Sequence, residues 1–300
     1  GGGDATAAGR AVMETGEFDY AWNLQLAPDV IAKMAEGGKG KPMSAFGTLV
    51  ERLELNMTDP SPDLPEGERA TAKHPHPFLT APELYASDNT DCLTQDIEGA
   101  KALLDEAGWV DSDGDGIREK DGVKLEILYQ TSTNAVRQDF QALIKDWWSQ
   151  IGVETELRNI DASVFFGGDP GSTDTFQRFY ADVEMYANNF DGTDPQSYLA
   201  QRTCAKFPSP ESQWQGENIN RFCEEEYDAM VAELGRTGEM EKRGELAKKL
   251  NDMLTKDSYS ILPLVDRGRV SAAANTLGGV VLNTWDSELW NAADWYRMEE

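Results

Sequence analysis

The sequence is short of positive charge and of histidine. Lysine and arginine number 27 against 54 acidic residues, the formal net charge is −27, and two histidines occur in 300 residues. A surface field this negative repels nucleic-acid phosphates and anionic lipid headgroups. These shortages argue against nucleic-acid binding and against binding to a membrane surface.

Long apolar runs and a leader-like segment are missing from this stretch of sequence. No run approaches the ~20 apolar residues that span a bilayer, and residues 1–9 are small and polar, unlike a signal peptide. Apolar residues still make up 40% of the chain, which suits a folded globular protein. If the protein is exported, we expect its targeting segment to lie outside this sequence.

Signatures of catalysis and of phosphate binding are absent as well. The motifs GxSxG, HExxH and GxxxxGK[ST] do not occur. With 54 acidic residues, carboxylate pairs arise by chance, and none stands out as a glycosidase-like dyad. We therefore predict that the protein is not an enzyme, and a carboxylate-based hydrolase is the alternative.

Cysteine is rare, and its odd count leaves one thiol without a partner in the chain. The three residues are Cys92, Cys204 and Cys223. Cys204 and Cys223 could close a loop that stabilises the fold by about 3 kcal/mol if they are oxidised. Three reduced thiols in a cytosolic protein are the other interpretation that composition allows.

Alternating and helical apolar patterns predict an α/β fold. Residues 123–129 and 153–157 alternate as strands, and residues 134–151 carry apolar side chains at helical spacing, Leu143 and Trp147 among them, up to Gly152. Two strands joined through one helix predict a parallel pair. Other expected elements are helices at residues 5–15, from Pro28 and at 96–108, strands at 18–24, 48–56, 183–186 and 260–265, and a loop-rich tail after the last strand.

An acidic loop carries the first half of a calcium-binding pattern. Its alternate carboxylates are Asp111, Asp113 and Asp115. Oxygen ligands at alternate positions can wrap a hard cation, and Gly116 permits the tight turn. The twelfth position is Gly122 instead of a bidentate carboxylate, although Glu119 or Asp121 could compensate. The loop predicts either a structural Ca²⁺ site or a metal-free Asp/Gly turn.

A second acidic loop follows the strand predicted to end at Tyr186. Residues 191–195 read DGTDP, and open α/β sheets bind ligands beyond the carboxyl ends of their strands. The carboxylate of Asp191 could bind the ammonium group of a ligand. An exposed Asp-Gly turn is the alternative.

Several stretches in this order resemble the peptide/nickel family, family 5, of ABC-transporter substrate-binding proteins, the dipeptide- and oligopeptide-binding type. The similar segments include GGGDATAAGRAVMETGEFDYAWNLQ, DIEGAKALLDEAGWVDSDGDGIREKDG, IGVETELRNIDASVFF and WQGENINRFCEEEYD. The resemblance implies a two-lobed, Venus-flytrap fold of the type II periplasmic-binding-protein kind, with a mixed sheet flanked by helices. It also implies a receptor that binds its ligand and does not convert it chemically.

The family plan assigns residues 1–46 and 263–300 to lobe I and residues 47–262 to lobe II. It makes this chain a C-terminal portion that lacks most of lobe I and a segment where Thr80 meets Ala81. On this plan the protein binds a peptide or similar small solute and delivers it to the permease of an ABC importer. We expect a monomer, periplasmic or anchored outside the membrane, with no required cofactor. A non-binding fragment is a further alternative.

The resemblance also implies a set of ligand-binding residues. Asp191 matches an aspartate that holds a peptide's α-ammonium group in oligopeptide-binding members, a charge-assisted contact. The other implied ligand-binding residues are Trp22, Asn23, Tyr186, Asn188 and Asn189. For each aromatic residue, ordinary core packing is the alternative. The resemblance further pairs Cys204 with Cys223, and Cys92 with a cysteine of the missing segment.

Overall fold

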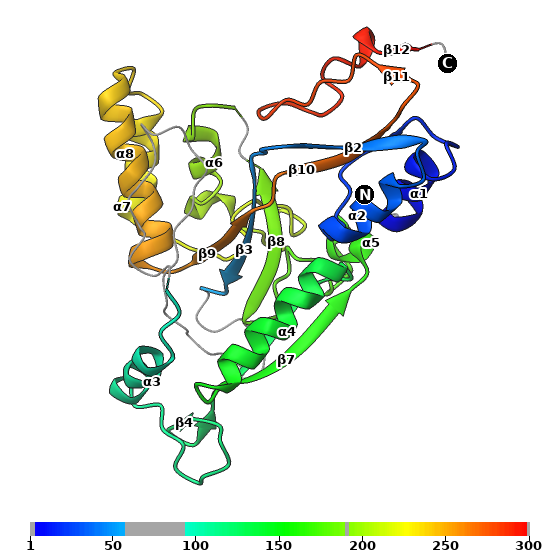
Figure 1. The fold of residues 1–300 in the computed structure, drawn as a ribbon. Coiled ribbons are helices and arrows are strands. Elements are labelled where there is room, and N and C mark those ends of the chain that lie inside the picture. The colour runs from blue at the N-terminus through cyan, green and yellow to red at the C-terminus, as the bar shows by residue number, and fades with distance from the viewer. Residues whose placement is uncertain (1–3, 58–93, 190–191, 299–300) are drawn as a thin grey trace. The chain divides into compact units, whose positions relative to one another are not determined.

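The computed structural model describes residues 4–57, 94–189 and 192–298, and the chain forms two compact units (Figure 1). The terminal unit comprises Gly1–Glu51, Ala187–Asp194 and Val265–Glu300. The middle unit comprises Arg52–Tyr186 and Pro195–Leu264. Assignment of residues 1–46, 47–262 and 263–300 to two lobes stays a prediction.

The terminal unit is built on three antiparallel strands in the order β1–β10–β2. Its elements are α1 (Ala5–Met13), β1 (Tyr20–Ala21), α2 (Pro28–Ala35), β2 (Gly40–Ala45), β10 (Arg269–Ala274), β11 (Leu277–Gly278), the 3₁₀ turn Ala292–Asp294 and β12 (Tyr296–Arg297). Strand β11 pairs with β12. The Asp4 carboxylate caps α1 by accepting from the Thr6 and Ala7 amides, which satisfies two of the free N–H groups at the start of the helix.

Strand β10 corrects the expectation of a loop-rich tail. It is the central strand of the terminal sheet, where Ala273 pairs with Tyr20 on one side and with Lys41 on the other. Alanine has a low strand propensity, so the sequence RVSAAA gives a weak strand signal. Small residues fit here because Ala272 and Ala274 are buried in the same apolar cluster as the helix residues Val12 and Met34.

A five-stranded sheet in the order β7–β6–β8–β3–β9 lies mostly in the middle unit, and one end of β3, β8 and β9 is assigned to the terminal unit. Its strands are β3 (Leu49–Leu55), β6 (Glu126–Ser132), β7 (Glu154–Ile160), β8 (Val183–Asn189) and β9 (Ile261–Asp266), and a two-stranded sheet joins β4 (Glu119–Lys120) to β5 (Val123–Lys124). Strand β6 pairs in parallel with β7 and with β8, so the predicted parallel pair is confirmed. Glu126 lies opposite Glu154, and Gln130 lies opposite Glu184.

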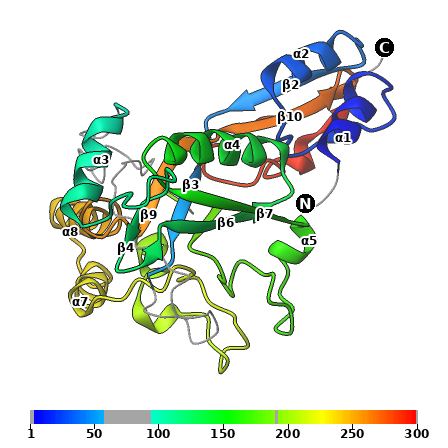
Figure 2. The same cartoon turned by 90° about the horizontal axis from the view of Figure 1, so that it is seen from below.

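Helix α4 (Ala135–Ser149) connects β6 to β7 and covers one face of these strands, as Figure 2 shows. Ile144 packs with Ile127 and Tyr129 in one apolar cluster. Gly152 ends the connection with a positive φ of +84°, as predicted from its position after the helix. Leu143 and Trp147, which belong to the apolar pattern of this helix, are 51% and 42% exposed. The buried stripe of α4 is narrower than the apolar pattern.

The middle unit has further helical segments. They are α3 (Ile97–Glu106), α5 (Ala162–Phe165), α6 (Gln196–Ala200), the 3₁₀ turn Cys204–Lys206, α7 (Glu225–Leu234) and α8 (Met240–Asp252), which continues into the π-helical turn Met253–Asp257. Those from α6 onward surround a second apolar cluster. Helices α7 and α8 run side by side in both views. Tyr227 and Leu250 are fully buried between them, together with Leu199 of α6. The Asp96 cap predicted for α3 is present, accepting from the Gly99 amide at 2.8 Å.

Candidate functional site

Two of the predicted ligand residues lie in the terminal unit just after β1. Trp22 is 58% exposed, so its ring is available to a partner. Asn23 has a φ of +51° and is held in place, since its amide donates to Ser271 Oγ at 3.2 Å and its Oδ1 accepts from Arg267 Nη2 at 3.1 Å. Asparagine tolerates this left-handed conformation better than most residues.

The other predicted ligand residues follow one another along β8. The Asn188 Oδ1 accepts from the Asn189 amide at 2.9 Å, and Asn189 is exposed. Tyr186 is buried, and its hydroxyl oxygen accepts from Arg52 Nη2 at 3.4 Å. Asp191 lies outside the described residues. Tyr186 therefore takes part in the interior of the middle unit, which matches the alternative stated for the aromatic residues.

The contacts of Tyr186 lead to a buried charged cluster that sequence reasoning missed. Arg52, Glu54 and Arg202 are all 0% exposed. Arg202 binds the Glu54 carboxylate through both of its terminal nitrogens, at 2.9 and 3.1 Å. Arg52 Nη2 lies 2.5 Å from Glu54 Oε1, and its Nη1 donates to the Tyr198 hydroxyl at 2.5 Å. The buried charges are thus paired, as their removal from water requires, although the Nε atoms of Arg52 and Arg202 have no hydrogen-bond partner among the described residues.

Electrostatics within the cluster favour the ionised carboxylate. Burial alone would raise the pKa of Glu54, but the guanidinium groups of Arg202 and Arg52 outweigh it and lower that pKa below its ordinary value. Burial and the nearby Glu54 charge raise the pKa of Tyr186. Tyr186 therefore stays protonated. The Arg52 guanidinium also lies 4.9 Å from the centre of its ring.

A sequence signal for this cluster exists, but it is ambiguous. Strand β3 reads LVERLEL, and an alternating strand normally places such charged residues toward solvent. In the structure the residues from Val50 to Leu55 are all buried, so both faces of β3 are covered, while β8 and β9 pair with its two edges. Arg202, which neutralises Glu54, comes from a segment about 150 residues further along the chain.

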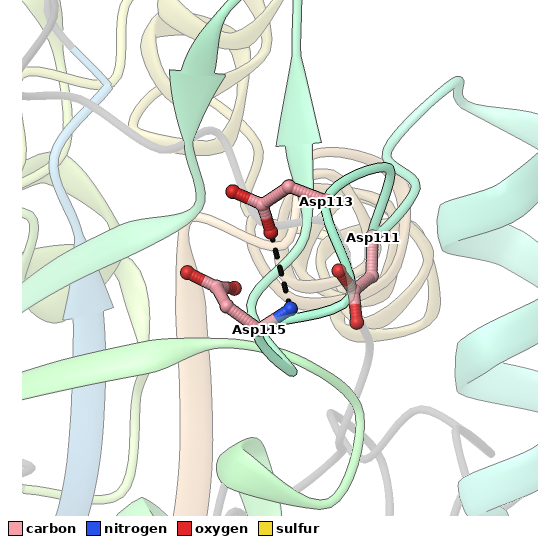
Figure 3. A group of neighbouring side chains, drawn as sticks. All are labelled: Asp111, Asp113 and Asp115. Atoms are coloured by element: carbon pink, nitrogen blue, oxygen red, sulfur yellow. Dashed lines mark hydrogen bonds between the residues drawn. The ribbon is translucent and has the colours of Figure 1, made fainter.

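The aspartate loop, residues 111–115, brings its three carboxylates together, as Figure 3 shows. One oxygen from each of Asp111, Asp113 and Asp115 lies within 4.8 Å of the others, and all three side chains are exposed. Glu119, the proposed fourth ligand, instead accepts from the amide and the hydroxyl of Ser112.

Hydrogen bonds within the aspartate loop hold it closed. Asp111 accepts from the Gly114 and Gly116 amides at 2.7 and 3.0 Å, and Asp113 accepts from the Asp115 amide at 3.1 Å. A hydrogen bond from the Lys124 ammonium group lowers the pKa of Asp115. Since Lys124 already supplies a positive charge and a twelfth-position carboxylate is missing, the residues fit a calcium ion incompletely. Calcium binding stays a prediction.

Two cavities in the middle unit are strongly acidic. One, of about 510 Å³, lies beside β6 and β7 and is lined by Glu126, Glu154, Glu156 and Asp182. The other, of about 490 Å³, is lined by residues of α7, α8 and the π-helical turn. Neither lining includes a residue predicted to contact the ligand.

A disulfide joins Cys204 to Cys223, as the resemblance implied. It ties the 3₁₀ turn that follows Arg202 to the start of α7. Cys92 lies outside the described residues. Among the helices that the structure describes, none combines the length and the apolar character needed to cross a bilayer.

Comparison of the sequence with known proteins gives one family. Residues 65–206 match the model of the bacterial extracellular solute-binding proteins, family 5, middle region. Over 65 residues the chain is 38% identical to the oligopeptide-binding protein AppA of Bacillus subtilis, a match that covers 21% of this chain and 12% of AppA.

Solved structures share the fold over almost the whole chain. AppA of Bacillus subtilis, in complex with a nonapeptide, has a TM-score of 0.73 at 19% identity, covering 99% of this chain and 59% of AppA. An oligopeptide-binding protein of Thermus thermophilus, in complex with a pentapeptide, has a TM-score of 0.75 at 19% identity. The match covers 99% of this chain and 57% of that protein. NikZ of Campylobacter jejuni, in complex with Ni(L-His), has a TM-score of 0.74 at 17% identity. The match covers 97% of this chain and 60% of NikZ. The chain therefore spans about three fifths of these relatives, and the predicted α/β fold of type II binding proteins is confirmed.

Proposed function

We propose that the chain, whose residues 65–206 match the model of the family 5 bacterial extracellular solute-binding proteins, is the ligand-binding part of a receptor for an ABC importer. The observation that carries the proposal is the family match within a chain whose fold follows peptide-binding relatives over 99% of its length. The receptor binds a ligand and passes it on without chemical change.

A peptide is the proposed ligand, and a metal chelate is the second candidate. Two of the similar structures hold peptides and one holds Ni(L-His). In our proposal Asp191 binds the ammonium group of the peptide, and Trp22, Asn23, Asn188 and Asn189 supply an aromatic face and amide groups for its backbone. Tyr186 supports β8 from the interior.

The hydrolase alternative has weak structural support. Such an enzyme needs two acids in one cleft with their pKa values pushed apart. Glu54, with a lowered pKa, and Glu184, with a raised pKa, meet the electrostatic condition. Both are 0% exposed, and neither lines either of the two cavities described above. A substrate therefore has no access to them in this conformation.

The proposal also covers location and partners. A binding receptor of this family acts outside the cytoplasmic membrane, as a monomer, and presents its ligand to permease subunits. Its two lobes correspond to residues 1–46 with 263–300 and to residues 47–262. No cofactor is required, and the aspartate loop is the candidate position for a weak structural Ca²⁺.

Ligand-dependent thermal stabilisation tests the proposal. The chain is incubated with a library of dipeptides to nonapeptides, with Ni²⁺–histidine, and with buffer, and its Tm is measured. A ligand that binds only the folded chain raises Tm, by an amount set by its concentration relative to Kd. Mass spectrometry of the recovered peptide should show no product. Conversion of a bound peptide would instead support the hydrolase.

The Asp191→Asn variant tests the position of the peptide ammonium group. Loss of a charge-assisted contact should weaken binding about 10- to 100-fold, as for a 1.5–3 kcal/mol hydrogen bond to a charged group. N-acetylated peptides, which lack the charge, should bind the two proteins equally. Asp139→Asn, an exposed aspartate on α4, is the matched control. Equal losses for charged and acetylated peptides would contradict the assignment.

A further inference from the structure

A carboxyl group and an amide group face each other across two neighbouring strands inside the middle unit. Glu184 on β8 is paired in register with Gln130 on β6. Their side chains are 0% and 1% exposed. Gln130 Nε2 donates a hydrogen bond to Glu184 Oε1, so the amide and carboxyl groups are in direct contact.

The other two oxygens of this pair have no donor. Glu184 Oε2 and Gln130 Oε1 are both buried and have no hydrogen-bond partner among the described residues. Two oxygens that only accept cannot satisfy each other, and an unpaired oxygen in the protein interior is unfavourable. Each of the two oxygens therefore lacks a hydrogen-bond donor within the described part of the chain.

The surrounding cations do not supply that hydrogen. The half-buried Arg221 is the cation whose charge acts on Glu184, but its guanidinium donates to three backbone carbonyls. Arg52 and Arg202 bond to Glu54 and to tyrosine hydroxyls. An ionised Glu184 would therefore accept one hydrogen bond from a neutral amide, beside the negative charge of Glu54.

The titratable neighbours on β8 itself are also engaged elsewhere. Asp182 Oδ2 accepts from the Leu128 amide at 2.8 Å, and the Tyr186 hydroxyl lies with Arg52. Neither side chain donates to Glu184 in the structure. A proton on the Glu184 carboxyl itself would supply the missing hydrogen.

We propose that Glu184 is a proton-binding site in the folded chain, with Glu184 Oε2–H donating to Gln130 Oε1 and closing a cyclic acid–amide pair between β6 and β8. The proton comes from solvent when the chain folds, and no covalent bond other than O–H forms. A single proton satisfies both unpaired oxygens. The pair then carries no charge, which suits its complete burial.

The proposal predicts how stability depends on pH. Burial raises the pKa of Glu184 well above its ordinary value of 4.5; the Gln130 hydrogen bond opposes this, the Glu54 charge adds to it, and Arg221 opposes it. A carboxyl protonated in the folded chain and ionised in the unfolded chain leaves the folded state with one more bound proton. Stability is therefore full below the ordinary pKa and is lost as pH rises through the folded-state pKa.

The Glu184→Gln variant tests this dependence. A glutamine can donate N–H to Gln130 Oε1 and accept from Gln130 Nε2, so it reproduces the protonated pair without a titrating group. As pH rises above the ordinary glutamate pKa of 4.5, we expect the wild-type Tm to fall, and we expect this pH-dependent fall to be missing in Glu184→Gln. Asp139→Asn, on the exposed surface of α4, should show the same fall of Tm with rising pH as the wild type. The proposal is overturned if the Tm of Glu184→Gln falls with pH as it does in the wild type, or if this variant does not fold.

Infrared spectroscopy detects the proton directly in the wild-type protein. At neutral pH exposed carboxyls are ionised, so a C=O stretch of a protonated carboxylic acid reports a buried one. We expect this band in the wild type, its loss in Glu184→Gln, and a shift in Gln130→Met, which removes the amide partner. The absence of the band, or a band that neither substitution changes, overturns the proposal.

Discussion

The buried charged cluster and the aspartate loop contain the same chemistry in opposite surroundings. In the cluster, Glu54 meets Arg52 and Arg202 with all three side chains at 0% exposure. In the loop, Asp115 meets Lys124 with both side chains more than a third exposed. The carboxylate–cation pair of the cluster is therefore shielded from solvent, and that of the loop is exposed to solvent.

The difference shows that the environment determines what an ion pair does. In the interior, removing one partner strands a charge that water cannot reach, so the pairing constrains which segments pack together. At the surface, water and salt replace a lost partner at little cost. The cluster therefore joins β3 to the segment after α6, while the loop organises only its own turn.

Glu54→Gln should give the largest effect of the changes that test this comparison. The substitution leaves two buried guanidinium groups without their carboxylate, and breaking a buried pair costs about 3–5 kcal/mol. Urea unfolding measures the loss. Glu217→Gln, which removes an exposed partner of Lys206, is the matched control and should leave the unfolding midpoint nearly unchanged. Equal effects of the two variants would contradict the comparison.

Loss of the disulfide should be next in size. Cys204→Ser with Cys223→Ser opens a loop with a sequence separation of 19, and chain entropy predicts a loss of about 3 kcal/mol. The bond lies directly after Arg202, so part of the loss should couple to the buried cluster. A double-mutant cycle with Glu54→Gln measures this coupling. Strict additivity would show that the disulfide and the cluster act independently.

Acid should destabilise the buried cluster more than it destabilises the exposed loop. Because Arg202 and Arg52 lower the pKa of Glu54 in the folded chain, its contribution is present above the ordinary value of 4.5 and is lost as pH falls through the lower folded-state value. Tm measured from neutral to acidic pH should fall for the wild type. The Tm of Glu54→Gln should fall less over this range, while the Tm of Asp115→Asn should fall as much as that of the wild type.

Changes in the aspartate loop should have the smallest effect. Because its carboxylates are exposed and already hydrogen-bonded, Asp115→Asn should shift Tm by no more than the error of the measurement. Calcium should bind weakly, with a Kd of about 10⁻⁴–10⁻³ M, and Asp113→Asn should abolish this binding in a calorimetric titration. Micromolar affinity for Ca²⁺ would show that the loop rearranges around the ion and that the comparison understates its role.

The sequence by itself determined the local elements and their class. The parallel connection from β6 through α4 to β7, the Asp96 cap of α3 and the turn at Gly152 all follow from periodicity and from backbone preferences that act over a few residues. The sequence also placed the three aspartates of the loop together, since their spacing is set within one turn.

The tertiary structure alone decided which charges are buried and what they contact. Glu54 and Arg202 lie far apart in the chain, and Gln130 meets Glu184 because β6 and β8 are neighbours in the sheet. The same holds for β10, whose alanines become a central strand when two other strands pair with it. Burial of a charged or small residue depends on contacts between distant segments, and those contacts form together in the folded chain.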